Sequence, residues 1–239
     1  MFGGKTILVV VPARGGSKGI PRKNLRKVGG ISLVSRVGQV VSNVPFIDRA
    51  VVSTDDEEIA LEGERSGLSS PFLRPKALSG DLVGDAEVLT HALLECERID
   101  QVRYDIIVML QPTSPLREAK HVTDTINVCV SGNWDAVWTV SETDSKAHPM
   151  KQLIIGDGAN LDYYDRRGES VIARQQLSTL YHRNGIAYAI TRDCLLEKKT
   201  IKGDRTTGLL IPGNHISIDT EWDLELANWV FEKRYGSNS

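Results

Sequence analysis

Short apolar runs alternate with amphipathic segments along most of this chain, and that alternation restricts the folds open to it. Residues 6–11 (TILVVV), 105–112 (DIIVMLQP) and 135–141 (DAVWTVS) are rich in apolar and β-branched side chains, as strands buried on both faces are. Residues 31–44 and 119–132 carry apolar side chains at helical spacing. This order predicts a Rossmann-like α/β fold, in which helices cover both faces of a mostly parallel sheet.

The same patterns predict the remaining elements. Further short strands are expected at residues 50–54, 185–191 and 215–219. Further helices are expected at residues 55–67 and 86–99, with Asp85 as a candidate N-cap of the second. Residues 145–182 have weak periodicity and no clear helix, which predicts an excursion away from the main sheet.

A last helix follows Thr220. Thr220 and Asp223 have the spacing of a capping-box variant, so Asp223 is expected to start the helix rather than bind a ligand. The side chains predicted to form the buried stripe of this helix are Trp222, Leu226, Trp229 and Val230.

Length and charge exclude several classes of protein. A chain of 239 residues with a formal net charge of −2 fits one large domain, and argues against a nucleic-acid or membrane-surface binder. The three cysteines are far apart and form no C-x-x-C motif, as is typical of reduced thiols. The first apolar run is too short for a membrane span and lacks a signal-peptide cleavage site, so a cytoplasmic protein is expected.

A basic, glycine-rich loop follows the first strand. Within ten residues it carries Arg14, Lys18, Arg22 and Lys23, and no acid intervenes. Ligands of open α/β sheets bind at the carboxyl ends of the strands, and glycine-freed N–H groups beside cations suit a polyphosphate. The loop fits neither the Walker A pattern nor G-x-G-x-x-G. The alternative is a surface turn with solvated cations.

The loop PARGGSKGIPRKN is followed in order by VVSTDDEEIA, FLRPKALSGD, LQPTSPLR, HPMK, ARQQL, NGIAY and SIDTEWDLELA. This ordered set covers nearly the whole chain and resembles the acylneuraminate cytidylyltransferases, or CMP-sialic acid synthetases. The resemblance implies a single domain over residues 1–239 with the fold of the nucleotide-diphospho-sugar transferases. It also implies transfer of CMP from CTP to the anomeric hydroxyl of a nine-carbon 2-keto sugar acid, with release of pyrophosphate.

By this resemblance, the triphosphate is held by Arg14, Ser17, Lys18 and Lys23, and Asn24 orients the phosphates or the ribose. The expected catalytic residues are Arg14, Lys18, Lys23 and Asp219. Arg22 is a weaker candidate, since it could point into solvent.

The resemblance places base recognition at backbone groups of Pro12 and Ala13 and at the guanidinium of Arg74. An arginine can donate to the cytosine carbonyl, and main-chain carbonyls can accept from the amino group that uracil lacks. Asp85 stands where relatives often have a small hydroxyl residue, so capping the next helix is at least an equal alternative for it.

Gln111 and Thr113 are implied to face the nucleotide sugar or the bound acid. Ser114 and Arg117 could equally belong to a helix start, with Ser114 as the cap and Pro115 in the first turn.

Asp219 is the candidate ligand for Mg²⁺, or Mn²⁺, which needs few carboxylates beside substrate phosphates. Many members of the resembled family have a second acid two residues earlier, where this chain has Ser217. A non-catalytic nucleotide-binding module of the same fold therefore stays an alternative.

Residues 145–182 match the family's dimerisation arm, which implies a homodimer whose arm reaches the partner's site. Sugar contacts are then implied for Gln111, Lys151, Arg174, Gln175, Gln176 and Tyr188, with Arg174 facing the sugar carboxylate.

The identity of the sugar acid stays open. Members specific for N-acetylneuraminate carry bulky aromatic residues between the NGIAY strand and the metal segment, and this chain has none there. That difference suggests a legionaminic-type, pseudaminic-type or deaminated acid. The alternative within the same fold is a 3-deoxy-manno-octulosonate cytidylyltransferase.

Overall fold

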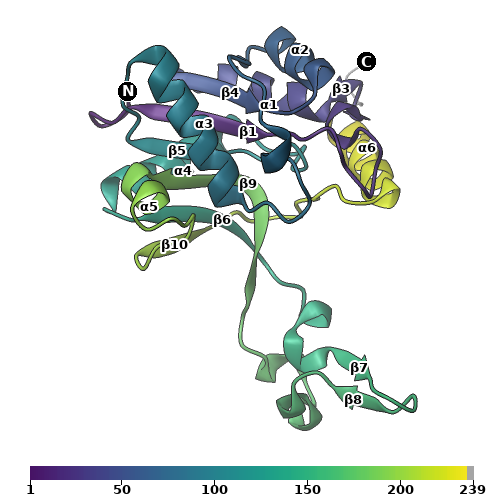
Figure 1. The fold of residues 1–239 in the computed structure, drawn as a ribbon. Helices are drawn as coiled ribbons and strands as arrows, with labels where there is room; N and C mark the ends of the chain where they lie inside the picture. The colour runs from purple at the N-terminus through teal and green to yellow at the C-terminus, as the bar shows by residue number, and fades with distance from the viewer. Residues whose placement is uncertain (236–239) are drawn as a thin grey trace.

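A six-stranded sheet forms the centre of the computed structural model, which describes residues 1–235 (Figure 1). Its strands, in spatial order, are β10 (Thr206–Leu210), β6 (Ala136–Glu142), β9 (Tyr181–Thr191), β5 (Ile106–Met109), β1 (Ile7–Pro12) and β4 (Arg49–Ser53). All neighbouring pairs are parallel except those that β9 makes with β5 and β6. The predicted mostly parallel α/β fold is confirmed.

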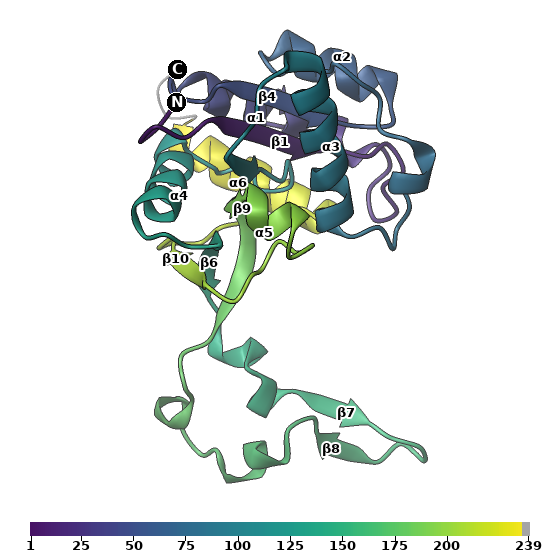
Figure 2. The same cartoon turned by 60° about the vertical axis from the view of Figure 1, so that its left-hand side comes forward.

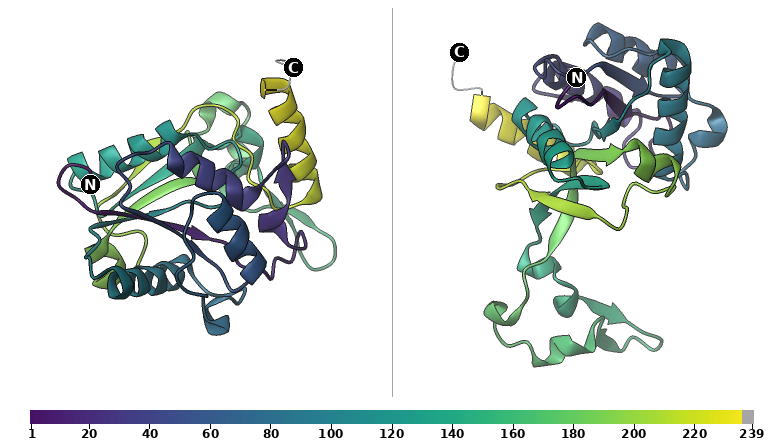
Figure 3. Two further views of the ribbon diagram at one scale, coloured as in Figure 1. Left: turned by 90° about the horizontal axis from the view of Figure 1, so that it is seen from above. Right: turned by 90° about the vertical axis from the view of Figure 1, so that its left-hand side faces the viewer.

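Helices cover both faces of this sheet (Figure 3). The helices are α1 (Leu33–Ser42), α2 (Glu57–Arg65), α3 (Asp85–Asp100), α4 (Ala119–Ser131), α5 (Arg192–Leu196) and α6 (Glu221–Tyr235). None of the helices within residues 1–235 combines the length and apolar character that a bilayer-spanning segment requires.

The central strand β1 shows why the apolar runs are continuous. Its Ile7, Val9 and Val11 pack in the cluster that includes α1 and α4, whereas Leu8 and Val10 pack in the cluster that includes α3 and α5. Successive side chains of a strand point to opposite faces, so a strand covered twice is apolar at every position. All three cysteines are free and buried in these layers.

The arm, residues 143–180, leaves the sheet between β6 and β9 and projects away from it (Figure 1 and Figure 2). It contains a small antiparallel hairpin of β7 (Leu153–Ile155) and β8 (Leu161–Tyr163), together with short 3-10 turns. Apolar side chains on it, such as Ile155 and Ile172, are largely exposed.

The predicted strand at residues 215–219 is wrong. This segment is extended but pairs with no strand among the described residues; Ile218 N–H makes one hydrogen bond of 2.9 Å, to the carbonyl of Thr113. Ile218 is apolar because it is buried in a small cluster with Ile20 and Leu33. The strand beside β6 at one edge of the sheet is β10, whose threonine and glycine residues did not predict a strand.

The capping of α6 is confirmed, but its predicted stripe is wrong. The Thr220 N–H donates to Asp223 Oδ2 at 2.8 Å, and the Asp223 N–H donates to Thr220 Oγ1 at 3.2 Å. Leu224 and Ala227 are the buried residues of the helix, whereas Trp222 is 71% exposed, and Leu226 and Trp229 are also exposed. The helix packs on the hairpin of β2 (Lys27–Val28) and β3 (Ile31–Ser32) rather than on the sheet, so a narrow stripe suffices.

Asp85 does not cap α3. It is the first residue of the helix, and Gly84 is the N-cap. The Gly84 N–H donates to the carboxylate of Glu87 at 3.1 Å, and no side chain caps the first turn of the helix.

Candidate active site

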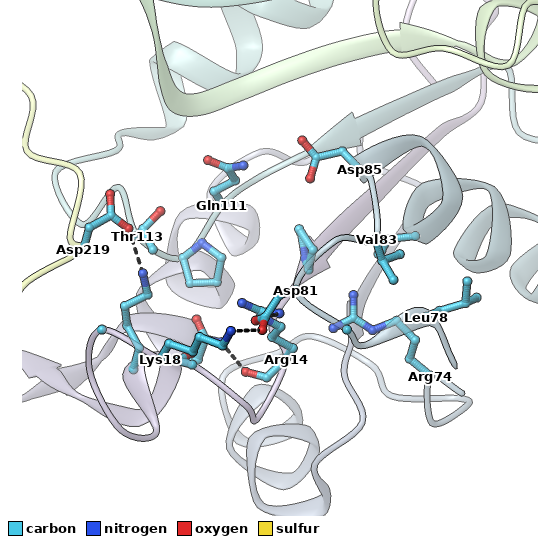
Figure 4. A pocket seen from close by; sticks show the side chains of 18 of the residues that line it. Arg14, Lys18, Arg74, Leu78, Asp81, Val83, Asp85, Gln111, Thr113 and Asp219 are labelled. Carbon is cyan, nitrogen blue, oxygen red and sulfur yellow. Dashed lines mark hydrogen bonds and ion pairs between the residues drawn. The ribbon is translucent and has the colours of Figure 1, made fainter. Parts of the chain in front are cut away.

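A pocket of about 510 Å³ opens where the loops after β1 and β5 meet the segment that precedes α6. These loops leave the carboxyl ends of neighbouring parallel strands, where open α/β sheets bind ligands. Side chains from separate parts of the chain face one another across it (Figure 4). The predicted site residues that line it are Pro12, Arg14, Ser17, Lys18, Lys23, Asn24, Arg74, Gln111, Thr113 and Asp219.

Two cations at one end of the pocket share a single carboxylate. Arg14 Nη1 lies 2.7 Å from Asp81 Oδ1, and Lys18 Nζ lies 2.5 Å from Asp81 Oδ2. Hydrogen bonding, chiefly from Lys18, lowers the pKa of the Asp81 carboxyl. The two cations thus converge on one anionic group, as cations that bind phosphate oxygens do. Asp81 is a pocket residue that the sequence patterns did not single out, although it is the acid of the FLRPKALSGD motif.

Lys23 and Asp219 form the second charged contact of the pocket. Lys23 Nζ donates to Asp219 Oδ1 and to the carbonyl of Ile218, both at 2.9 Å. The loop crosses this segment closely, because a Cβ added at Gly19 would lie 2.5 Å from the carbonyl oxygen of Asp219. Glycine at position 19 therefore lets the basic loop approach the candidate metal residue.

Two residues of the basic loop have structural contacts. Arg22 adopts a left-handed backbone conformation, with φ of 53°, and its guanidinium pairs with Asp56 and Glu58 at the start of α2. Asn24 lines the pocket, but its amide donates to the carbonyl of Arg14 at 2.9 Å and so fixes the shape of the loop. Ala13 is buried and its N–H donates to Ser53 at 2.9 Å, so that N–H is committed to the sheet.

The other end of the pocket is apolar except for Arg74 and Asp85. Leu78 and Val83 lie there (Figure 4). Arg74 is 5% exposed, and its Nε and Nη2 have no hydrogen-bond partner within the described chain. Desolvation by burial lowers the pKa of this guanidinium, against the opposing effect of nearby Asp55. A buried guanidinium with free N–H donors can bind a ligand that supplies an acceptor, such as a carbonyl group.

Ser114 and Arg117 do not start a helix, because α4 begins at Ala119 with Glu118 as its N-cap. The Ser114 hydroxyl donates to the carbonyl of Asn184 at 2.8 Å. Arg117 is buried and donates to the carbonyls of Gln111, Gly185 and Ile186. Burial lowers the pKa of Arg117 to about 9. Both side chains brace the pocket-lining segment at Gln111 against β9.

Asp219 and Ser217 both line the pocket at its cationic end. Within residues 1–235, no group of three or more His, Cys, Asp or Glu side chains could hold a metal by itself. One carboxylate, with a serine two residues before it in the pocket lining, fits a hard cation that takes most of its oxygen ligands from water and substrate phosphates. The donor set therefore fits Mg²⁺ or Mn²⁺ that arrives with a triphosphate.

Tyr188 lies in the core rather than at the pocket wall. It is 2% exposed, its ring centroid is 5.4 Å from that of Trp138, and its hydroxyl accepts from the Gly185 N–H at 2.8 Å. The aromatic residue completes the packing under β9, which accounts for its place in the alternating strand. Its implied contact with a sugar is therefore not available in this structure.

The remaining predicted sugar-binding residues lie on the arm. Lys151, Arg174, Gln175 and Gln176 are exposed and lie away from the pocket of their own chain (Figure 2). Gln176 also has a local role, because its side-chain oxygen accepts from the N–H groups of Ile172 and Ala173. Within one chain, only Gln111 of the predicted sugar-binding set lines the pocket.

Relatives with assigned names match nearly the whole chain. A pseudaminic acid cytidylyltransferase of Campylobacter jejuni is 29% identical over 231 residues, which cover 96% of this chain and 98% of that protein. A CMP-N,N'-diacetyllegionaminic acid synthase of Legionella pneumophila is 30% identical over 229 residues, with 95% and 96% covered.

Solved structures share the fold. The structure of a CMP:2-keto-3-deoxy-manno-octonic acid synthetase complexed with CTP has a TM-score of 0.69 at 17% identity, and the match covers 96% of this chain and 99% of that one. A sequence model described as Cytidylyltransferase matches residues 8–238. With the basic loop, the buried Arg74 and Asp219 gathered in one pocket, this match shows that the chain belongs to the cytidylyltransferase family.

Proposed function

We propose that this protein transfers CMP from CTP to the anomeric hydroxyl of a nine-carbon 2-keto sugar acid and releases pyrophosphate. One observation carries the proposal: a single pocket joins a cationic end, with Arg14, Lys18 and Lys23, to an apolar end that contains an unpartnered buried arginine. A triphosphate fits the first end and a nucleobase with a carbonyl group fits the second.

The side chains support an in-line displacement at the α-phosphorus. The sugar hydroxyl oxygen forms a bond to that phosphorus and releases its proton to solvent, and the bond to the β-phosphate oxygen breaks with its electron pair leaving on pyrophosphate. Arg14, Lys18 and Lys23 neutralise the charge on the phosphates and on the leaving group. Asp219, with Ser217 beside it, would hold Mg²⁺ or Mn²⁺, which supplies further charge neutralisation when bound.

The acceptor site needs residues beyond the pocket of one chain. Arg174 and Lys151 are exposed on the projecting arm, so we propose a homodimer in which each arm reaches the partner's pocket. A guanidinium there would pair with the carboxylate of the sugar acid. CTP as a substrate also favours action in the cytoplasm.

The proposed acceptor is a pseudaminic-type or legionaminic-type acid. Two full-length relatives carry those names. This chain also has no Phe, Trp or Tyr between Tyr188 and Ser217, where larger rings would restrict the space around a sugar.

Pyrophosphate release with CTP and Mg²⁺ tests this proposal against a panel of acids: N-acetylneuraminate, its deaminated form, legionaminate, pseudaminate and 3-deoxy-manno-octulosonate. We expect release with a nine-carbon acid, and loss of release when EDTA removes the metal. Activity with the eight-carbon acid alone would assign the alternative acceptor. If no acid in the panel supports pyrophosphate release while CTP still binds, the protein would be a nucleotide-binding module rather than a transferase.

A further inference from the structure

The arm has almost no core, and the one side chain buried in it belongs to a histidine. Of residues 143–180, only His148 and Gly168 are buried, and His148 is 5% exposed. The apolar side chains of the arm's hairpin, such as Ile155 and Leu161, lie on the surface. Burying a polar ring costs free energy that burying an apolar side chain does not. The histidine at this position therefore needs a reason other than apolar packing.

The two nitrogens of the His148 ring have different surroundings. Nδ1 accepts a hydrogen bond from the Met150 N–H at 3.1 Å, so the neutral ring carries its proton on Nε2. Nε2 is buried and has no hydrogen-bond partner within the described residues. A leucine would fill much of the same space without burying an unpaired N–H group. The hydrogen bond at Nδ1 is therefore the contribution that a polar side chain alone can make here.

This hydrogen bond shapes the turn that carries Lys151. His148 is the N-cap of the short 3-10 turn Pro149–Lys151, and its own carbonyl accepts from the Lys151 N–H at 2.8 Å. The turn is thus closed on His148 through both the side chain and the backbone of that residue. Lys151 is exposed, and its ammonium makes no hydrogen bond or ion pair within the described residues.

A second contact holds the same turn against the rest of the arm. It packs on the 3-10 turn Arg166–Ser170, and the approach is so close that a Cβ added at Gly168 would collide with the carbonyl oxygen of Met150. The backbone of Met150 is therefore held at its N–H by His148 and at its carbonyl side by the neighbouring turn. The direction in which the next side chain, Lys151, leaves the arm depends on this geometry.

We infer that His148 is a positioning residue for the acceptor acid: its Nδ1 holds the turn that presents Lys151, and it acts on the carboxylate of the acid only through that lysine. This inference rests on the proposed use of the arm's cations to bind the acid. An ammonium must lie within about 3 Å of a carboxylate oxygen to form a charge-assisted hydrogen bond, so a loosened turn weakens that contact. No residue of the arm lines the pocket proposed for CTP, so CTP binding should not depend on His148.

Three substitutions separate the roles of the ring in steady-state kinetics of pyrophosphate release, with legionaminate and pseudaminate as the acids. His148→Leu keeps a buried side chain but removes the acceptor, and should raise the KM for the acid about 10-fold while the KM for CTP stays unchanged. His148→Asn retains an acceptor that can cap the turn, and should return the KM for the acid to within about 3-fold of the wild type. His182→Ala, which removes an exposed imidazole beside Thr143 at the base of the arm, is the matched control and should change neither KM.

A double-mutant cycle tests whether His148 acts through Lys151. Lys151→Met removes the ammonium, so adding His148→Leu to it should raise the KM for the acid no further. Effects of the two substitutions that multiply would overturn the inference, because His148 would then act by another route. An unchanged KM for the acid in His148→Leu would also overturn it, as would an equal rise in the KM for CTP.

Hydrogen–deuterium exchange tests the turn without any acid. The N–H groups of Met150 and Lys151 should exchange faster in His148→Leu than in the wild type, and at close to the wild-type rate in His148→Asn, with no change in the main sheet. Equal exchange in all three proteins would overturn the inference. If exchange responds as expected but no acid supports pyrophosphate release, the transferase proposal fails and His148 still positions Lys151. If an acid is used but neither exchange nor its KM responds, the transferase stands and the inference is wrong.

Discussion

Two buried arginines, Arg74 and Arg117, have opposite relations to the protein around them. Arg117 donates to three backbone carbonyls, whereas the Nε and Nη2 of Arg74 have no partner in the described chain. Burying a charged group costs free energy that hydrogen bonds must offset. Arg117 is thus a structural residue, and we propose that Arg74 binds a ligand.

This contrast predicts opposite effects of the same substitution. Arg117→Met should lower the free energy of unfolding by about 3 kcal/mol or more, because it removes buried, charge-assisted hydrogen bonds to three carbonyls. Arg74→Met should leave that free energy within about 1 kcal/mol of the wild type, yet weaken CTP binding at least about 10-fold. Urea unfolding and calorimetry measure the two quantities. A large loss of stability in Arg74→Met would contradict the assignment.

Lys18 should matter for turnover far more than for folding. Its side chain is 80% exposed and its one ion pair, with Asp81, is a surface contact worth little. Lys18→Ala should therefore leave the melting temperature within a few degrees of the wild type and reduce kcat about 100-fold or more. A fall of many degrees, with activity per folded molecule retained, would show that the lysine is structural.

The sequence motifs predicted most of the charged residues that line the pocket. The pocket is lined by Arg14, Lys18, Lys23 and Asp219. These residues meet because the loop after β1 and the segment before α6 lie together at the carboxyl ends of the strands. The sequence could not predict that Asp81 pairs with Arg14 and Lys18, or that Arg117 bonds to residues nearly seventy positions away. Such contacts depend on how loops return in space, and no local periodicity encodes them.

At the scale of elements, the doubly buried strands were predictable and the peripheral ones were not. β1 and β5 are apolar at every position because helices cover both faces. Residues 215–219 alternate like a strand, but Ile216 and Ile218 are apolar because they pack in a local cluster. The spacing of apolar residues predicts which side chains are buried, but it does not predict which element of the fold buries them.

Glu62 joins two of these elements and predicts a pH-dependent stability. Its Oε1 accepts from the hydroxyls of Ser32 at 2.7 Å and Ser35 at 2.9 Å, so α2 is bound to the start of α1. These hydrogen bonds, that from Ser32 first, lower the pKa of Glu62. A depressed carboxyl pKa stabilises the fold above the unfolded pKa, and that contribution is lost as the pH falls through the folded value.

Glu62→Gln should accordingly lower the free energy of unfolding by about 1 kcal/mol at pH 7. The difference from the wild type should shrink as the pH falls below about 4, where the wild-type carboxyl also becomes neutral. Glu64→Gln, an exposed position on the same helix, is the control and should have no comparable effect. A difference that is constant from pH 7 to pH 3.5 would contradict the assignment.

At the scale of the whole molecule, the candidate pocket lies apart from the predicted sugar contacts on the arm. Arg14 and Lys18 are in the main domain, whereas Arg174 is on the arm that projects from it (Figure 1). If each arm completes the partner's site, a dimer contains two sites that each need residues from both chains.

Mixing two inactive variants tests this arrangement. Lys18→Ala lacks a pocket cation and Arg174→Ala lacks an arm cation, so each homodimer should have low activity. In a randomly exchanged mixture, heterodimers contain one site with both residues intact, which restores roughly a quarter of wild-type activity. Absence of recovery, with subunit exchange verified by native mass spectrometry, would contradict an arm that acts on its partner.

We propose that the anomeric hydroxyl of a sugar acid attacks the α-phosphorus of CTP in this pocket. The most direct test is the fate of an oxygen-18 label placed in that hydroxyl, followed by mass spectrometry of the product. We expect the label to be retained in the oxygen that joins the sugar to CMP, and unlabelled pyrophosphate to be released. Loss of the label from the product, or a product that still contains the β-phosphate, would contradict nucleotidyl transfer.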